Sequence, residues 1–144
     1  MNRKQLGATA VEFALALLVF LTFFFGITDF ARMLFTWGAA NEAVRHGARF
    51  AAICDDTANA AQVLARMRGL LPQIDSINLA WDPVGCTAAT CESVTVTITG
   101  LNYHWISPIA GITSLPVITM PTFATTLPRE IMKQDAVAAQ FACA

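Results

Sequence analysis

The longest uninterrupted apolar segment of the chain lies near its beginning. Residues 13–28 carry no charged side chain, and residues 8–28 contain a single acid, Glu12. As a helix, residues 8–28 are about 31 Å long at about 1.5 Å per residue, which matches a bilayer core of about 30 Å. The pattern predicts a membrane-spanning helix, with Glu12 inside or at the edge of the hydrocarbon layer.

The helical pattern continues beyond this apolar segment. Positions at alternating steps of four and three form one seam, which is the spacing typical of packed helices; they are Phe30, Leu34, Trp37, Asn41, Val44 and Ala48. We therefore expect one helix over residues 8–53, in which residues 29–53 extend beyond the membrane. The seam fits packing against neighbouring helices and burial against the chain's own domain equally well.

The remaining residues, 54–144, predict a small head domain. Residues 58–70 have a helical composition and end at Gly69 and Pro72. Apolar and polar side chains alternate in segments that we interpret as strands; these are residues 77–81, 94–98 and, at a sheet edge, 122–127. The expected fold class is α+β, with a long N-terminal helix that is transmembrane in its first half. A short helix and an antiparallel sheet of two to four strands follow it.

Charge sets the expected orientation and excludes one class of partner. The chain is 56% hydrophobic and 13% charged with a formal net charge of −1, whereas typical globular chains are about 25% charged. It has no basic patch, so we expect no nucleic-acid partner. Arg3 and Lys4 precede the apolar segment. The positive-inside rule then places the N-terminus in the cytoplasm and residues 54–144 on the outer side.

Four cysteines lie on the predicted outer side; they are Cys54, Cys86, Cys91 and Cys143. An even number in a small exported domain predicts two disulfides, for which three pairings are possible. We expect Cys86–Cys91 as a local link and Cys54–Cys143 as a link from the end of the long helix to the C-terminal tail. No Cys-x-x-Cys spacing is present, so we expect no metal site.

The start of the apolar segment differs from an ordinary secretory signal. Such a signal has a shorter apolar core that ends in a small-x-small cleavage site, whereas this core is long and is followed by Asp29. The sharp small-residue junction, Gly7–Ala8, lies before the core instead. Cleavage there removes a basic leader, residues 1–7, and leaves the new amino group of Ala8 one helical turn from Glu12.

These residues resemble a known family. The leader junction is similar to that of pilins whose leader is cut after Gly. It consists of Gly7, then Ala-Thr-Ala-Val, and then Glu12 and Phe13. The wider segment resembles the TadE-like family of pseudopilins. The residues that carry this resemblance are the run Ala-Val-Glu-Phe-Ala-Leu at 10–15, the group Gly26, Ile27, Asp29 and Arg32, and residues 39–52.

The resemblance implies a pseudopilin-like structural component of a bacterial tight-adherence (type IV-related) pilus assembly and secretion system. It implies cleavage at Gly7–Ala8 by a prepilin peptidase, with Glu12 and Phe13 acting in assembly. The implied partners are other pilins or pseudopilins, tight-adherence inner-membrane components and the lipid bilayer. The implied location is the inner membrane, crossed once, with the C-terminal domain in the periplasm, either retained there or placed in or at the base of a pilus.

Interpretations that give several of these residues no specific function stay open. Glu12 has no role in assembly if its carboxylate merely reaches the headgroups. Arg45 and Arg49 lie one turn apart and suit either a partner-docking face or a solvated face. The alternative function is a signal-anchored periplasmic binding module that is neither processed nor polymerised. His104 stands in no catalytic motif, so we expect no enzymatic activity and no cofactor.

Overall fold

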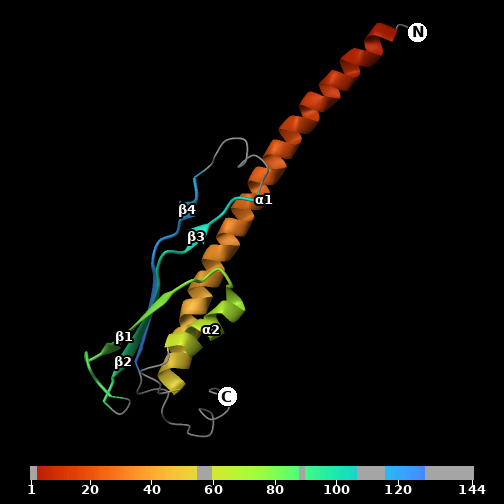
Figure 1. Cartoon of the computed structure of the whole chain (residues 1–144). Helices are drawn as coiled ribbons and strands as arrows, with labels where there is room; N and C mark the ends of the chain where they lie inside the picture. Colours follow the sequence, from red (N-terminus) through yellow and green to blue (C-terminus); the bar gives the residue numbers. More distant parts are fainter. Residues whose placement is uncertain (1–2, 55–59, 88–89, 107–115, 129–144) are drawn as a thin grey trace. The chain divides into compact units, whose positions relative to one another are not determined.

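The computed structural model describes residues 3–54, 60–87, 90–106 and 116–128, with residues 3–6 described by their backbone alone. Within these residues the elements follow one another as shown in Figure 1; they are α1 (Arg3–Cys54), α2 (Ala60–Leu70), β1 (Ile77–Asp82), β2 (Ser93–Ile98), β3 (Asn102–Tyr103), β4 (Ile118–Thr119) and β5 (Phe123–Pro128). The predicted α+β class and the order of its elements are confirmed.

The described residues divide into two compact units. The first unit takes its residues from Met1–Phe35 and His104–Val117, and the second from Thr36–Tyr103 and Ile118–Ala144. Helix α1 contributes its first part to the first unit and its last part to the second unit. The last turns of α1 form part of the core of the second unit, and the division into a helical extension, residues 29–53, and a head domain, residues 54–144, stays a prediction.

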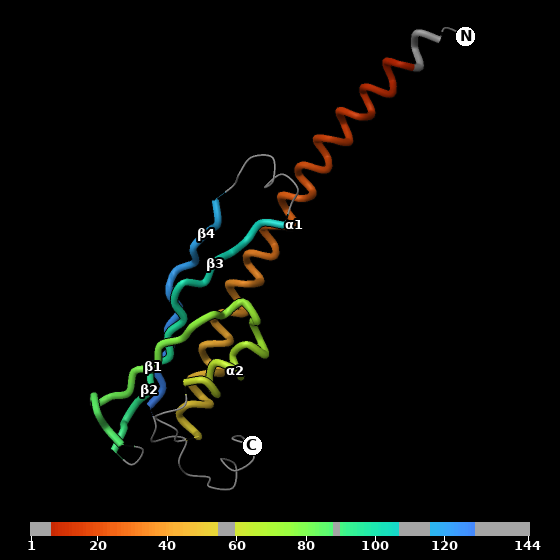
Figure 2. Tube along the Cα trace, in the orientation of Figure 1, coloured from red at the N-terminus to blue at the C-terminus, as the bar shows by residue number. Residues whose placement is uncertain are grey.

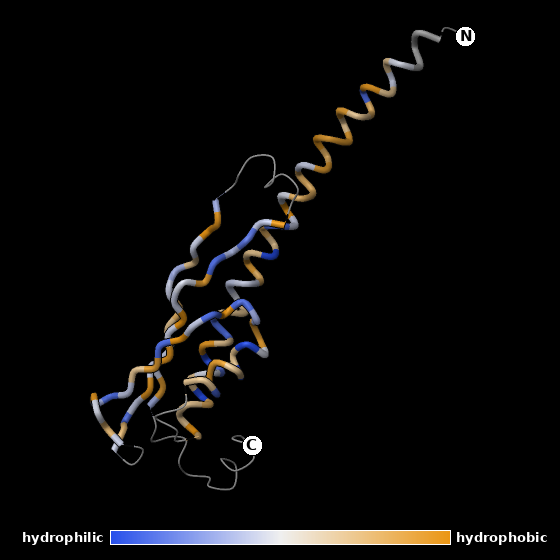
Figure 3. Tube along the Cα trace, viewed as in Figure 1, coloured by the Kyte–Doolittle hydropathy of each residue, from blue (hydrophilic) through white to orange (hydrophobic). Residues whose placement is uncertain are grey.

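Helix α1 begins earlier than the sequence pattern predicted. It starts at Arg3 rather than at residue 8, because Arg, Lys, Gln and Leu are all good helix formers and the single glycine that follows them, Gly7, weakens a helix without ending it. Residues 7–24 are exposed in the single chain, and hydrophobic colouring covers most of this part of α1 in Figure 3. The helix is long and apolar enough to cross a membrane and fits a single-pass anchor.

A three-stranded antiparallel sheet forms the main β structure, with the strand order β1-β2-β5. Val96 of β2 lies opposite Leu79 of β1 and Thr125 of β5, and residues two positions away along each strand share that face. The side chains of β2 on this face, Val94, Val96 and Ile98, are buried. The opposite face includes Thr95, Thr97 and Thr126, and the hydroxyls of Thr95 and Thr126 are hydrogen-bonded at 2.8 Å. The predicted strands are confirmed, with β5 at an edge.

A second sheet was not predicted. Strands β3 and β4 pair in an antiparallel manner over two residues each, and the backbone N–H of Met120 donates to the carbonyl of Leu101 at 2.8 Å. Gly100 separates β2 from β3 with a φ of 71°, a conformation that glycine adopts without strain. Strand β4 is too short, and too close to prolines, to give an alternating pattern in the sequence.

The core of the second unit is built around the last part of α1. This part of the helix buries small side chains, which allow close approach of its neighbours; they are Ala40, Ala43, Ala48, Ala51 and Ala52. Val63 and Met67 of α2 are buried against the same helix near Gly47. The ring of Trp37 meets that of Phe123 edge-to-face, with 5.2 Å between centroids. Figure 2 traces these segments side by side.

Candidate functional site

The residues predicted to act in processing and assembly all lie on the exposed first part of α1. Gly7, Ala8, Glu12 and Phe13 are exposed, Phe13 to 69%. Ala8 and Glu12 are four residues apart and therefore lie on the same side of the helix. A Cβ atom placed on Gly7 meets no atom within 4 Å. Packing in this fold therefore does not require glycine at position 7, although glycine weakens a helix by about 0.5–1 kcal/mol relative to alanine.

The apolar surface of α1 around these residues is larger than a protein in water normally exposes. Its large side chains are exposed along the whole segment; they are Val11, Phe13, Leu15, Leu17, Leu18, Val19, Phe20, Leu21, Phe23, Phe24 and Ile27. Two polar side chains within the segment, Thr22 and Thr28, donate to carbonyls four residues earlier, each at 2.8 Å, and so need no outside partner. Contiguous apolar surface of this extent marks contact with lipid or with other helices.

The structure divides the predicted packing seam into two parts. Val44 and Ala48 are buried in the core of the second unit. The other four seam residues, Phe30, Leu34, Trp37 and Asn41, are exposed. Trp37 nevertheless contacts Phe123, and the side-chain amide of Asn41 donates to the carbonyl of Trp37 at 3.1 Å. Own-domain burial thus applies to the end of the seam, while packing of its exposed beginning against a partner stays a prediction.

The predicted docking pair lies on the outer side of the same helix. Arg45 and Arg49 are exposed. Between them in sequence, Nε2 of His46 lies 3.4 Å from a carboxylate oxygen of Glu42, and both side chains are more than half exposed. Exposed pairs of this kind contribute little to stability. Arg45 and Arg49 are therefore accessible to a partner, and their docking role stays a prediction.

Asp29 has a position that the sequence did not reveal. It is only 3% exposed, and one of its carboxylate oxygens accepts a hydrogen bond from the backbone N–H of Ile106 at 3.2 Å. Next to Ile106, the indole Nε1–H of Trp105 donates to the carbonyl of Pro116 at 3.0 Å. We call the group formed by Asp29, Trp105, Ile106, Pro116 and Val117 the Asp29 junction. The sequence signal for it is an acid placed directly after an apolar segment, which points to a special position but not to its partner.

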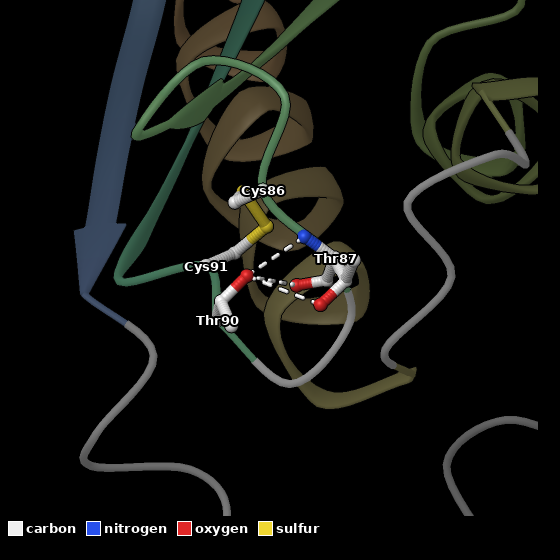
Figure 4. The surroundings of a disulfide bond; sticks show 4 residues. All are labelled: Cys86, Thr87, Thr90 and Cys91. Carbon is white, nitrogen blue, oxygen red and sulfur yellow. Dashed lines mark hydrogen bonds between the residues drawn. A yellow bond between two sulfur atoms is a disulfide. The ribbon is translucent and has the colours of Figure 1, made fainter.

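One predicted disulfide is present. Cys86 and Cys91 are bonded in the connection between β1 and β2, with 5.0 Å between their Cα atoms. Figure 4 shows how the loop is closed further, because the Thr90 hydroxyl accepts from the backbone N–H of Thr87 at 2.8 Å. Cys54 is also disulfide-bonded. Cys143 lies outside the described residues, so the Cys54–Cys143 bond stays a prediction.

The described residues do not meet the requirements of a metal site. Within residues 3–54, 60–87, 90–106 and 116–128, no three His, Cys, Asp or Glu residues lie where they can jointly hold a metal ion. His104 is exposed and follows the short strand β3. Among residues 8–28 of α1, exposed apolar side chains surround Glu12, the one charged side chain of that segment.

Comparison with known proteins bears on most of α1. The model of the family described as TadE-like protein matches residues 7–49. The match includes Gly7, Glu12 and Asp29 and confirms the resemblance predicted from the sequence. Searches of curated proteins and of solved structures found no match.

Proposed function

We propose that this chain is a pseudopilin-like structural component of a bacterial tight-adherence pilus assembly and secretion system. It crosses the inner membrane once, with its N-terminus in the cytoplasm and its C-terminal domain in the periplasm. One observation carries the proposal: the segment that matches the TadE-like family begins with an exposed apolar helix in which Gly7 stands five residues before the only acid of residues 8–28. The chain acts by helix packing rather than by catalysis.

The arrangement of Gly7, Ala8 and Glu12 suggests how processing prepares the helix for assembly. A prepilin peptidase cuts after Gly7 and frees the amino group of Ala8, one turn from Glu12. A carboxylate in a hydrocarbon environment is costly unless it is paired. The new positive amine and the N-terminal end of the helix dipole both favour a negative charge at this place. Pairing of Glu12 with the Ala8 amine of its own or a neighbouring subunit then holds the helices in register.

The amino terminus of the protein tests this proposal directly. We expect mass spectrometry of the protein from a host membrane containing the peptidase to find a chain that starts at Ala8. Gly7→Leu should start at Met1, because the junction is lost. Gly26→Leu is the matched control, since a Cβ on either glycine meets no atom within 4 Å, and it should still start at Ala8.

The opposite result points to a different class of protein. If the wild-type chain keeps Met1 although an active peptidase is present, the proposed processing is wrong. The chain is then a signal-anchored binding module, and the search turns to what its C-terminal domain binds.

A further inference from the structure

We propose that the Asp29 junction is a second membrane contact, in which Trp105, Ile106 and Val117 lie in the headgroup region of the bilayer that α1 crosses. The inference rests on one part of the proposed function, the spanning of a membrane by α1. It does not depend on processing or on assembly into a pilus. Its occupant is lipid, on the side of the membrane where the apolar segment ends.

The position of Asp29 fixes the level of the junction along α1. The uncharged segment ends at Thr28, and residues 8–28 already match the thickness of a hydrocarbon core. Asp29 therefore lies at the boundary between acyl chains and headgroups. Because the Ile106 N–H group donates to the Asp29 carboxylate, with 3.2 Å between nitrogen and oxygen, the backbone at residue 106 is held at this same level.

A second hydrogen bond gathers apolar side chains there. The bond from Trp105 to the Pro116 carbonyl brings Val117 to the same place. Ile106 is 63% exposed and Val117 is 47% exposed, although the neighbouring Asp29 is covered by protein. The junction thus buries its charge and leaves its apolar side chains uncovered, which is the reverse of the arrangement expected beside water.

The composition of this part of the chain suits a lipid contact. From residue 93 to residue 128 the sequence contains no Asp, Glu, Lys or Arg, so this segment brings no side chain of these types out of water when the junction meets the bilayer. Trp is enriched at membrane interfaces, where its ring is apolar and its N–H needs a polar partner. Here the Pro116 carbonyl already supplies that partner.

Fluorescence quenching by brominated lipids tests the contact on the full-length chain. The sequence contains three tryptophans, Trp37, Trp81 and Trp105. The protein carrying Trp37→Phe and Trp81→Phe is reconstituted in phosphatidylcholine vesicles with bromine at shallow acyl positions. We expect at least twofold quenching of Trp105. The matched protein that keeps Trp81 instead should be quenched by less than a tenth.

A positive control separates the junction from the membrane span. Phe20→Trp, in a chain without other tryptophans, reports on the middle of the apolar segment and should be quenched most by deep bromines. If Phe20→Trp is quenched while Trp105 is not, α1 crosses the bilayer and the proposed contact is wrong. If neither is quenched, the span itself fails and the proposal fails with it.

Variants of Asp29 test the hydrogen bond that holds the junction at the boundary. Asp29→Ala removes the acceptor of the Ile106 N–H and should reduce the quenching of Trp105 at least twofold, whereas Asp29→Asn keeps an acceptor oxygen and should preserve most of it. Another outcome overturns the proposal in favour of a second copy of the chain. In that outcome brominated lipids do not quench the fluorescence of Trp105. Its emission wavelength nevertheless shifts when added lipid dilutes the protein and separates its copies.

Discussion

The packing of Gly47 against α2 gives the sharpest stability prediction. A Cβ atom on Gly47 lies 2.5 Å from Sδ and 2.9 Å from Cγ of Met67, and 3.4 Å from Cγ1 of Val63. Met67 is fully buried and Val63 is 2% exposed, so either side chain can yield to the new atom only by repacking within the core. Gly47→Ala should therefore force α2 away from α1. By contrast, a Cβ on Gly38 of the same helix meets nothing within 4 Å.

The expected magnitude follows from two opposing terms. Alanine in place of glycine stabilises a helix by about 0.5–1 kcal/mol, whereas adding a methyl group to a packed core costs about 1–3 kcal/mol. Gly38→Ala gains only helix propensity and should raise the free energy of unfolding. Gly47→Ala gains the same helix propensity but also adds a methyl group to the packed core, so it should lower the free energy of unfolding. The two variants should differ by about 1–3 kcal/mol, the size of the packing term.

The assay is urea unfolding of the full chain in detergent, followed by tryptophan fluorescence. A third variant isolates the contact, because Met67→Ala removes the side-chain atoms that the new methyl group at position 47 would meet. In the Met67→Ala background, Gly47→Ala should become stabilising, as Gly38→Ala is in the wild type; this is a double-mutant cycle. Equal effects of Gly47→Ala and Gly38→Ala in the wild-type chain would refute the proposed packing of α2 on α1.

Two further predictions concern assembly and the β1–β2 connection. Glu12→Ala should leave leader cleavage intact but reduce the amount of the protein in purified pili at least tenfold. The control Glu42→Ala, which removes an exposed acid of the same helix, should not reduce this amount. Normal amounts of Glu12→Ala protein in pili would contradict the assembly role. Replacing Cys86 and Cys91 together by serine should lower the free energy of unfolding by about 2 kcal/mol, since the loop they close is short. Urea unfolding measures this, and an unchanged midpoint would mean that the hydrogen bonds of the connection close the loop without the disulfide.

Local sequence patterns were sufficient for most of the secondary structure. The alternation of Val94, Val96 and Ile98 with threonines reflects one buried and one exposed face of β2, and strand β2 can be read from its own residues. The long apolar segment likewise predicts α1 by length alone. Cys86 and Cys91 are separated by five residues, so this pairing is also favoured by short-range geometry.

Features that depend on distant residues were not predictable in the same way. The seam of α1 has one spacing throughout, yet Val44 is buried and Phe30 is not, because only the last part of the helix is covered by the strands and α2. Asp29 bonds to Ile106 across 77 positions, and nothing near either residue identifies the other. Strand β4 exists only because β3 pairs with it.

The glycines of α1 show how structure separates packing constraints from functional ones. At Gly47 a Cβ atom would meet the buried side chain of Met67, so packing favours glycine there. At Gly7 the fold makes no such demand, and a glycine there only weakens the helix. Gly26 and Gly38 of α1 are open in the same way, so the absence of a packing contact does not by itself distinguish Gly7 from them. What distinguishes Gly7 is its place five residues before Glu12, the only acid of residues 8–28. The proposed processing therefore rests on this spacing and on the family match, and the Gly26→Leu control separates it from a general effect of filling an open glycine.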